Sequence, residues 1–88
     1  MITATDIQRI DNAEDGICYQ FKSVINGNNF EDYTLFVDDE TQYGDSVYVW
    51  SDGLFNGRKE FKNTTQAENF ALEYLTKARA KFIKFHTN

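Results

Sequence analysis

The sequence predicts one α+β domain, spanning residues 1–88, in which an antiparallel β-meander of three to four strands packs against one long C-terminal amphipathic helix. Short segments rich in β-branched and aromatic residues occupy the middle of the chain, and dipeptides of Asp or Asn followed by Gly separate them. In the last third, apolar residues instead recur at steps of three and four, the spacing of one helix face. The length of 88 residues suits a single domain.

The composition is that of a folded chain without disulfides. Hydrophobic residues make up 41% and aromatic residues 16%, enough apolar surface for a core. Cys18 is the only cysteine, and its apolar neighbours predict a buried structural side chain in a reducing compartment. No apolar run approaches the roughly 20 residues of a membrane span, and no basic region followed by an apolar one opens the chain. We therefore expect a cytoplasmic protein.

The N-terminal segment admits two interpretations. Thr5 and Gln8 have the spacing of a capping box, and Ile7 and Ile10 are three apart, which together favour a short helix ending near Gly16. Alternatively, residues 4–11 form a strand in a hairpin closed by residues 12–16. The sequence favours the helix and leaves the strand open.

The middle of the chain divides into segments of strand length. Ile17–Ile25 alternates apolar and polar residues, as a half-buried strand does. Tyr33–Val37 and Val47–Trp50 are dense in β-branched and aromatic residues, and Arg58–Lys62 fits a short edge strand whose charges protect the edge. Because the connections are short, we expect these strands to pair as an antiparallel meander.

The C-terminal third carries the clearest signal, a helix over residues 64–85. Capping-box spacing marks its start twice, at Asn63 with Gln66 and at Thr65 with Glu68. Its apolar residues form one stripe: Ala67, Phe70, Ala71, Tyr74, Leu75, Ala78, Phe82 and Phe85. At about 33 Å, the helix is long enough to overhang the sheet. An exposed stripe end, with Phe82 and Phe85, would be covered in a homodimer, so a monomer and a homodimer both stay open.

Residues that catalysis or metal binding would need are sparse. His86 is the only histidine and lies two residues from the end, a poor place for a general base or a metal ligand. Segment 11–16 has Asp, Asp and Gly at calcium-loop positions, but Ala13 and Lys22 stand where ligands are required. No nucleophile-and-base pair and no Gly-rich phosphate loop occurs. We predict a non-enzymatic protein with no catalytic residue, metal or cofactor; a loose cation site within Asp38–Asp45 stays open.

The net charge of −5 is unevenly distributed. Residues 1–57 contain eleven acids and two bases, whereas residues 58–88 contain seven bases and three acids. Acidic turns with interspersed aromatic residues are typical of protein-binding surfaces, and an acidic surface can occupy the basic groove of a nucleic-acid-binding protein. We predict a partner-binding surface formed by Asp38, Asp39, Glu40, Tyr43, Asp45, Trp50 and Asp52. The alternatives are acidic turns that are simply solvated, and aromatic residues that belong to the core or stack on sugars.

A second hypothesis uses the basic end of the helix. Lysines and an arginine gather there at Lys77, Arg79, Lys81 and Lys84, a set suited to nucleic acid or an anionic membrane. The helix dipole also explains bases near a helix C-terminus, and a net charge of −5 repels polyanions. We therefore favour a protein-binding module without a membrane partner, with a small nucleic-acid-binding accessory protein as the alternative.

The closing layout of the chain resembles a known group of proteins. A short strand segment at Arg58–Phe61, a cap at Asn63–Thr65 and a final helix, in a small acidic chain without proline, resemble the small inhibitors encoded by bacteriophages, including the anti-CRISPR proteins. The resemblance covers roughly residues 54–88. It implies an inhibitor that occupies a binding surface of a host protein such as a CRISPR effector. These inhibitors share no motif, so the resemblance transfers no site residue.

Overall fold

The computed structural model describes residues 1–12 and 16–86. In chain order its elements are β1 (Ile2–Ala4), β2 (Gln8–Asn12), β3 (Gly16–Ile25), β4 (Asn28–Asp39), the short 3-10 helix η1 (Thr41–Tyr43), β5 (Val47–Ser51), β6 (Arg58–Phe61) and α1 (Thr64–His86). The predicted α+β fold is confirmed, because an antiparallel sheet packs against one long C-terminal helix.

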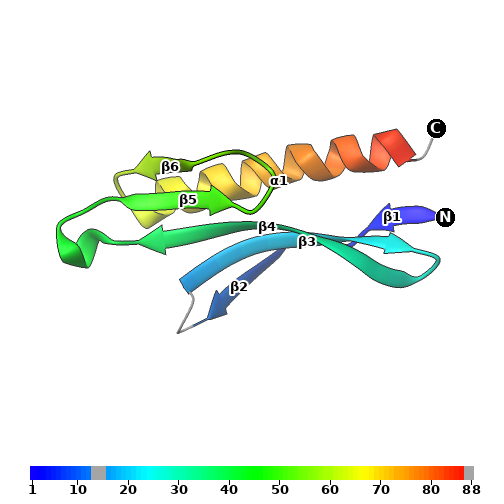
Figure 1. Ribbon diagram of the computed structural model, residues 1–88, viewed down its shortest axis with the longest axis horizontal. Helices are drawn as coiled ribbons and strands as arrows, with labels where there is room; N and C mark the ends of the chain where they lie inside the picture. The colour runs from blue at the N-terminus through cyan, green and yellow to red at the C-terminus, as the bar shows by residue number, and fades with distance from the viewer. Residues whose placement is uncertain (13–15, 87–88) are drawn as a thin grey trace.

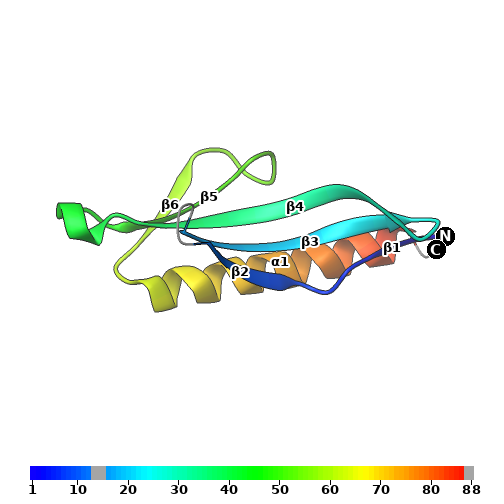
Figure 2. The same cartoon turned by 90° about the horizontal axis from the view of Figure 1, so that it is seen from below.

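The strands form a single antiparallel sheet with α1 on one face. Its order is β1-β3-β4-β5-β6, and β2 pairs with β3 along the same edge as β1. The predicted meander is the run from β3 to β6, in which consecutive strands are neighbours. The domain is elongated, 47 × 22 × 20 Å, with η1 at one end and the N-terminus and the end of α1 at the other (Figure 1). Within residues 1–12 and 16–86, no helix or strand covers the face of the sheet opposite α1 (Figure 2).

The β3–β4 hairpin turns at Asn26 and Gly27, as the sequence predicts. Both residues have positive φ, 51° and 84°, the geometry that matches a two-residue turn to the twist of its strands. The strands then shift register between Lys22 and Val24. At this irregularity the hydroxyl of buried Ser23 accepts a hydrogen bond of 2.9 Å from the backbone N–H of Glu31.

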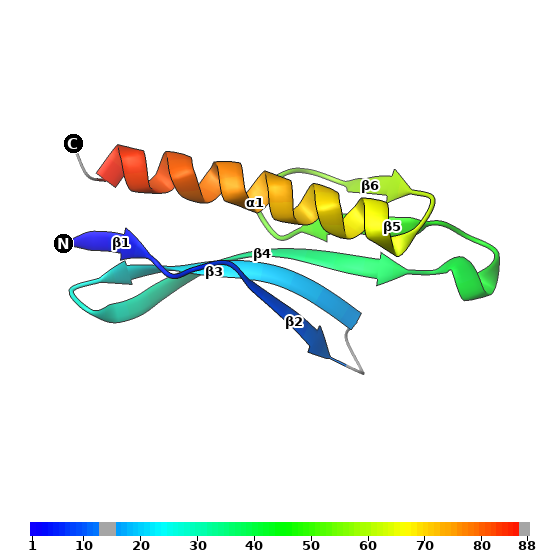
Figure 3. The same ribbon diagram turned by 180° about the vertical axis from the view of Figure 1, so that it is seen from behind.

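The predicted N-terminal helix is wrong, and the alternative strand over residues 4–11 is confirmed in part, because the segment forms two strands with residues 5–7 between them. β2 pairs with β3 from Gln8 opposite Gln20 onward, and β1 pairs with the other half of β3 (Figure 3). Between them the backbone N–H of Thr5 bonds to the carbonyl of Lys22 at 2.8 Å. A helix this short has few internal hydrogen bonds to offset its nucleation cost, whereas the edge of β3 offers a long row of partners. The expected hairpin closure falls partly on residues 13–15, outside the described residues.

The core lies between α1 and the sheet. Small side chains at Ala67 and Ala71 let the helix approach the sheet closely, and together with Leu75 they are fully buried. On the sheet, alternate residues of the three central strands face them: Tyr19, Phe21, Leu35, Val37, Val47 and Val49. The helix begins where predicted, because the side chain of Asn63 accepts a hydrogen bond of 2.9 Å from the N–H of Gln66.

The end of α1 lies over β1 and the β3–β4 hairpin, where Ile83 packs against the core, so the expected overhang beyond the sheet is wrong (Figure 1). Phe82 is half-buried against Phe21 and Tyr33, with ring centroids 6.2 and 5.7 Å away, whereas Phe85 is 79% exposed.

Cys18 departs from its predicted burial. It is only half-buried, because it alternates with buried Tyr19 and so faces away from the helix.

Candidate protein-binding surface

A stacked aromatic pair lies on the sheet face opposite α1, here called the open face. Val47 and Val49 point toward the helix, so strand alternation puts Tyr48 and Trp50 on the open face. Phe36 is the cross-strand partner of Trp50, and the two rings stack with centroids 4.3 Å apart at 19°. Trp50 is still 40% exposed. The prediction that Trp50 belongs to a surface is therefore supported by its position, and its placement in the core is excluded.

This pair belongs to a row of side chains that crosses the sheet. Successive strand pairings place residues opposite one another in the order Ile10, Cys18, Phe36, Trp50 and Arg58. Residues directly opposite on one face of a sheet are neighbours. The open face therefore has an apolar row that ends in a cation.

Tyr48 illustrates how the open face satisfies its own polar groups. The guanidinium carbon of Arg58 lies 3.7 Å from the centroid of the Tyr48 ring, within the range of a cation–π contact. The Tyr48 hydroxyl donates a hydrogen bond to Asp45. This bond and a second one from the N–H of Ser46 lower the pKa of the Asp45 carboxyl. Asp45 is therefore ionised near neutral pH.

A groove lies beside the aromatic pair. It has a volume of about 250 Å³ and is lined by Asp32, Thr34, Phe36, Trp50 and Asp52. Three of these residues alternate along β4 and therefore share one face. Asp32 forms an exposed ion pair with Lys22 at 3.7 Å. Within the part of the chain that the structure describes, Asp52 has no hydrogen-bond or ion-pair partner.

The predicted contact residues separate into two groups. Asp38, Trp50 and Asp52 belong to the open face. Asp39, Glu40, Tyr43 and Asp45 instead form the tip of the β4–β5 hairpin, at the end of the domain where η1 lies (Figure 1). The two groups are separate because the tip residues lie at the end of β4 and in its connection to β5. Trp50 and Asp52 lie at the opposite end of β5.

The hairpin tip is held by its own acids. Asp39 accepts hydrogen bonds from the hydroxyl of Thr41 at 2.6 Å and from its N–H at 3.0 Å, and these bonds lower the pKa of the Asp39 carboxyl. The carbonyl of Glu40 accepts bonds from the N–H groups of Tyr43 and Asp45. Tyr43 itself is 79% exposed. The Asp39 side chain and the Glu40 carbonyl thus shape the turn, and the Tyr43 ring is exposed beside them.

The basic end of α1 is partly occupied within the molecule. Arg79 donates from Nε to the carbonyl oxygen of Thr5 at 2.7 Å, and Lys77 pairs with Glu73 at 3.0 Å. Of the four predicted basic residues, Lys81 and Lys84 are the exposed ones without a described partner. The alternative nucleic-acid surface therefore keeps two of its four predicted basic residues available.

Residues 1–12 and 16–86 contain no gathering of three His, Cys, Asp or Glu side chains that could hold a metal ion. The candidate calcium segment 11–16 includes residues 13–15, which lie outside the described residues. Within the described chain, no helix has the length and apolarity needed to cross a membrane.

The predicted contact residues do not include the β4 side of the groove. From the sequence, Asp32 is one of the acids of a negative face, whereas nothing in it indicates Thr34, Phe36 or Arg58. Their period of two along β4 is visible in the sequence. The sequence does not show that these residues lie beside Trp50, because this depends on the register between β4 and β5. That register depends on the geometry of the tip between the two strands.

No family model matches the chain, and no curated protein or solved structure matches it significantly. The function must therefore be inferred from the surface itself, and the open face combines an exposed tryptophan with a groove that two carboxylates line.

Proposed function

We propose that this protein is a non-catalytic protein-binding module that places its open face on a basic surface of a partner protein. The observation that carries the proposal is the Phe36–Trp50 stack, which holds a 40% exposed indole on an uncovered sheet. Tryptophan is among the residues most enriched at binding hot spots, because it offers a large contact area with a hydrogen-bond donor. A rigid sheet also keeps the ring in place before binding, which lowers the entropic cost of association.

Charge supports a basic partner. Four acids lie on the open face (Asp32, Asp38, Asp52 and Glu60), against two bases, Lys22 and Arg58, and the tip residue Asp45 adds a fifth acid through its bond to Tyr48. The surface is therefore negative around an aromatic centre. Complementary charge raises association rates and excludes acidic partners. Proteins that handle nucleic acid present such basic surfaces, and the resemblance to bacteriophage inhibitors makes a CRISPR effector one candidate partner.

The alternative function, a nucleic-acid accessory protein acting through the helix end, has weaker support. Arg79 is engaged with Thr5 and Lys77 with Glu73, so the free positive charge on α1 is small. Counterion release, which drives binding to nucleic acid, scales with the number of phosphates neutralised. Two exposed lysines would therefore contribute little affinity.

The experiment compares the wild type with the double variant Trp50→Ala/Asp38→Lys as bait in bacterial lysate at low salt. We expect a basic protein that wild type retains and the variant loses, and that added nucleic acid displaces. Binding of that purified protein should then be about tenfold or more weaker for the variant. Lys84→Ala serves as the matched control and should retain the partner. A partner that is lost with Lys84→Ala and kept by the open-face variant would contradict the proposal.

A further inference from the structure

We infer that the groove lined by Asp32, Thr34, Phe36, Trp50 and Asp52 receives an arginine side chain of the partner. This inference rests on the proposed function and names the chemical group that the open face recognises. The groove volume of about 250 Å³ is below the range of pockets for drug-sized ligands, so it suits one side chain. Its two carboxylates disfavour an anion and favour a cation.

The open face already contains a guanidinium bound to an aromatic ring, at Tyr48, two residues before Trp50 on β5. Arg58 places its guanidinium 3.7 Å from the Tyr48 ring centroid, and Tyr48 is bonded to Asp45. On this face a guanidinium thus lies over an aromatic ring whose hydroxyl is bonded to a carboxylate. The arrangement shows which side chain the local geometry of the sheet accommodates.

The groove repeats these components without the cation. Trp50 supplies the ring, and indole is the best of the aromatic side chains for cation–π contact. Asp52 supplies a carboxylate that has no partner within the described chain, and Asp32 contributes a second one. Arg58 is opposite Trp50 in the register, but its guanidinium lies over Tyr48, and Trp50 stays 40% exposed although Phe36 stacks on one face of its ring.

Arginine fits this groove better than lysine. A planar guanidinium can stack on the indole and donate in its plane to the carboxylates at the same time, whereas an ammonium is a point charge with stronger hydration. Thr34 donates its hydroxyl hydrogen to Gln20 at 3.2 Å, which leaves lone pairs of its oxygen to accept a further N–H. Arginine has five such donors in a fixed geometry.

Trp50 is the only tryptophan, so its fluorescence reports on this groove directly. The experiment titrates the protein with a blocked peptide of four Arg-Gly repeats and with its Lys-Gly counterpart at low salt. We expect the arginine peptide to shift the emission and to bind about threefold or more tighter than the lysine peptide. Asp52→Asn should remove this preference, whereas Glu73→Gln, which removes the same charge from the exposed surface of α1, should keep it.

The outcomes separate the inference from the proposed function. Equal affinity and equal emission change for the two peptides, or a preference that survives Asp52→Asn, would overturn the arginine groove and leave a basic partner in place. No binding of either peptide at low salt would count against both. Circular dichroism of Asp52→Asn identifies a folding defect, and Asp32→Asn then provides the second test, with the same expected loss of preference.

Discussion

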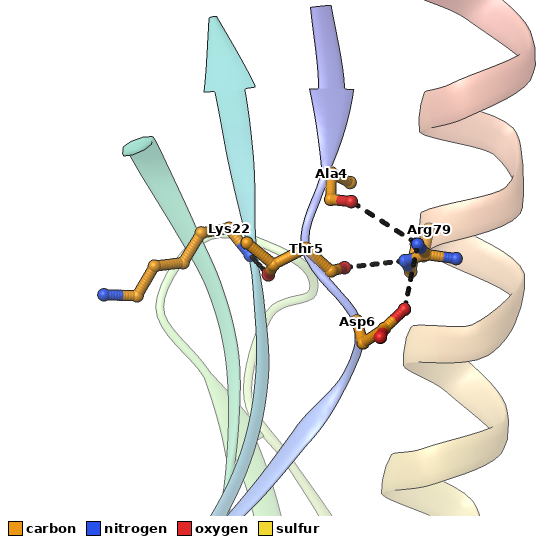
Figure 4. A network of polar contacts seen from close by, with 5 residues as sticks. All are labelled: Ala4, Thr5, Asp6, Lys22 and Arg79. Carbon is orange, nitrogen blue, oxygen red and sulfur yellow. Dashed lines mark hydrogen bonds and ion pairs between the residues drawn. The ribbon is translucent and has the colours of Figure 1, made fainter. Parts of the chain in front are cut away.

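Arg79 in the last third of the chain donates a hydrogen bond of 2.7 Å from Nε to the main-chain oxygen of Thr5, 74 positions earlier (Figure 4). Its Nη2 lies 3.4 Å from the carbonyl oxygen of Ala4 and 3.5 Å from the carboxylate of Asp6. On the other side, the hydroxyl of Thr5 accepts from the N–H of Lys22 at 2.8 Å. The connection between β1 and β2 is thus held between α1 and β3.

Loss of the Arg79 guanidinium should loosen this connection. We expect Arg79→Ala to lower the free energy of unfolding by about 1–3 kcal/mol, because two backbone carbonyls lose a charged donor. Urea denaturation gives the value. Lys77→Ala is the control, because its ion pair is exposed on both sides and should contribute less than about 0.5 kcal/mol. Equal losses for the two variants would contradict the role assigned to Arg79.

The end of α1 offers a pair of phenylalanines that differ in burial. Phe82→Ala should cost about 2–3 kcal/mol of stability, because the ring packs on Phe21 and Tyr33. Phe85→Ala should change stability by less than about 0.5 kcal/mol, since Phe85 is 79% exposed. Thermal or urea unfolding measures both. A large loss for Phe85→Ala at low protein concentration would contradict the exposed position of this ring.

Glu68 links acid stability to the contact between β2 and α1. Its Oε1 accepts from Arg9 Nε at 2.6 Å and from the Tyr19 hydroxyl at 2.7 Å. The bond from Arg9 is the main reason that the pKa of Glu68 is lowered below its ordinary 4.5. As the pH falls, the unfolded state therefore takes up a proton first. The stability from this carboxylate is complete above pH 4.5 and is lost as the pH falls through the lower, folded-state pKa.

The corresponding test is Glu68→Gln, followed by urea denaturation at a series of pH values. We expect lower stability than wild type at pH 7 and a shallower fall in stability below pH 4.5. Glu73→Gln, which removes a carboxylate from the exposed surface of the same helix, is the matched control for the loss of charge. An unchanged acid slope in Glu68→Gln would mean that the Arg9 contact does not persist in solution.

The sequence predicts two caps at the start of α1, at Asn63 and at Thr65, and the structure supports the cap at Asn63. Asn63→Ala should destabilise the protein by about 1 kcal/mol, because it removes the side-chain acceptor for the N–H of Gln66. Thr65→Ala should change stability by less than about 0.5 kcal/mol, since Thr65 lies inside the helix and is exposed. Amide hydrogen exchange of the first turn provides an independent measurement. A larger loss of stability for Thr65→Ala than for Asn63→Ala would mean that Thr65, not Asn63, caps the helix.

Much of the sheet and helix was predictable, whereas the N-terminal strands were not. The stripe of α1 and the alternation of β3 are local periodicities, so each could be recognised without knowing its neighbours. Residues 2–12 have no decisive local pattern, because their state depends on an open edge of β3 that exists only after the hairpin has formed. Tertiary pairing therefore overrode a capping-box spacing at Thr5 and Gln8.

The candidate surface divides in the same way. By itself, the sequence determined the fold class, the two-residue turn at Asn26 and Gly27, the apolar stripe of α1 and the acidic character of the β4–β5 hairpin, because residue type and spacing specify each of these locally. Only the tertiary structure decided that Val47 and Val49 face the helix and that Trp50 stacks on Phe36 beside Asp52. Alternation allows either face of a strand to be buried, and the packing partner selects one.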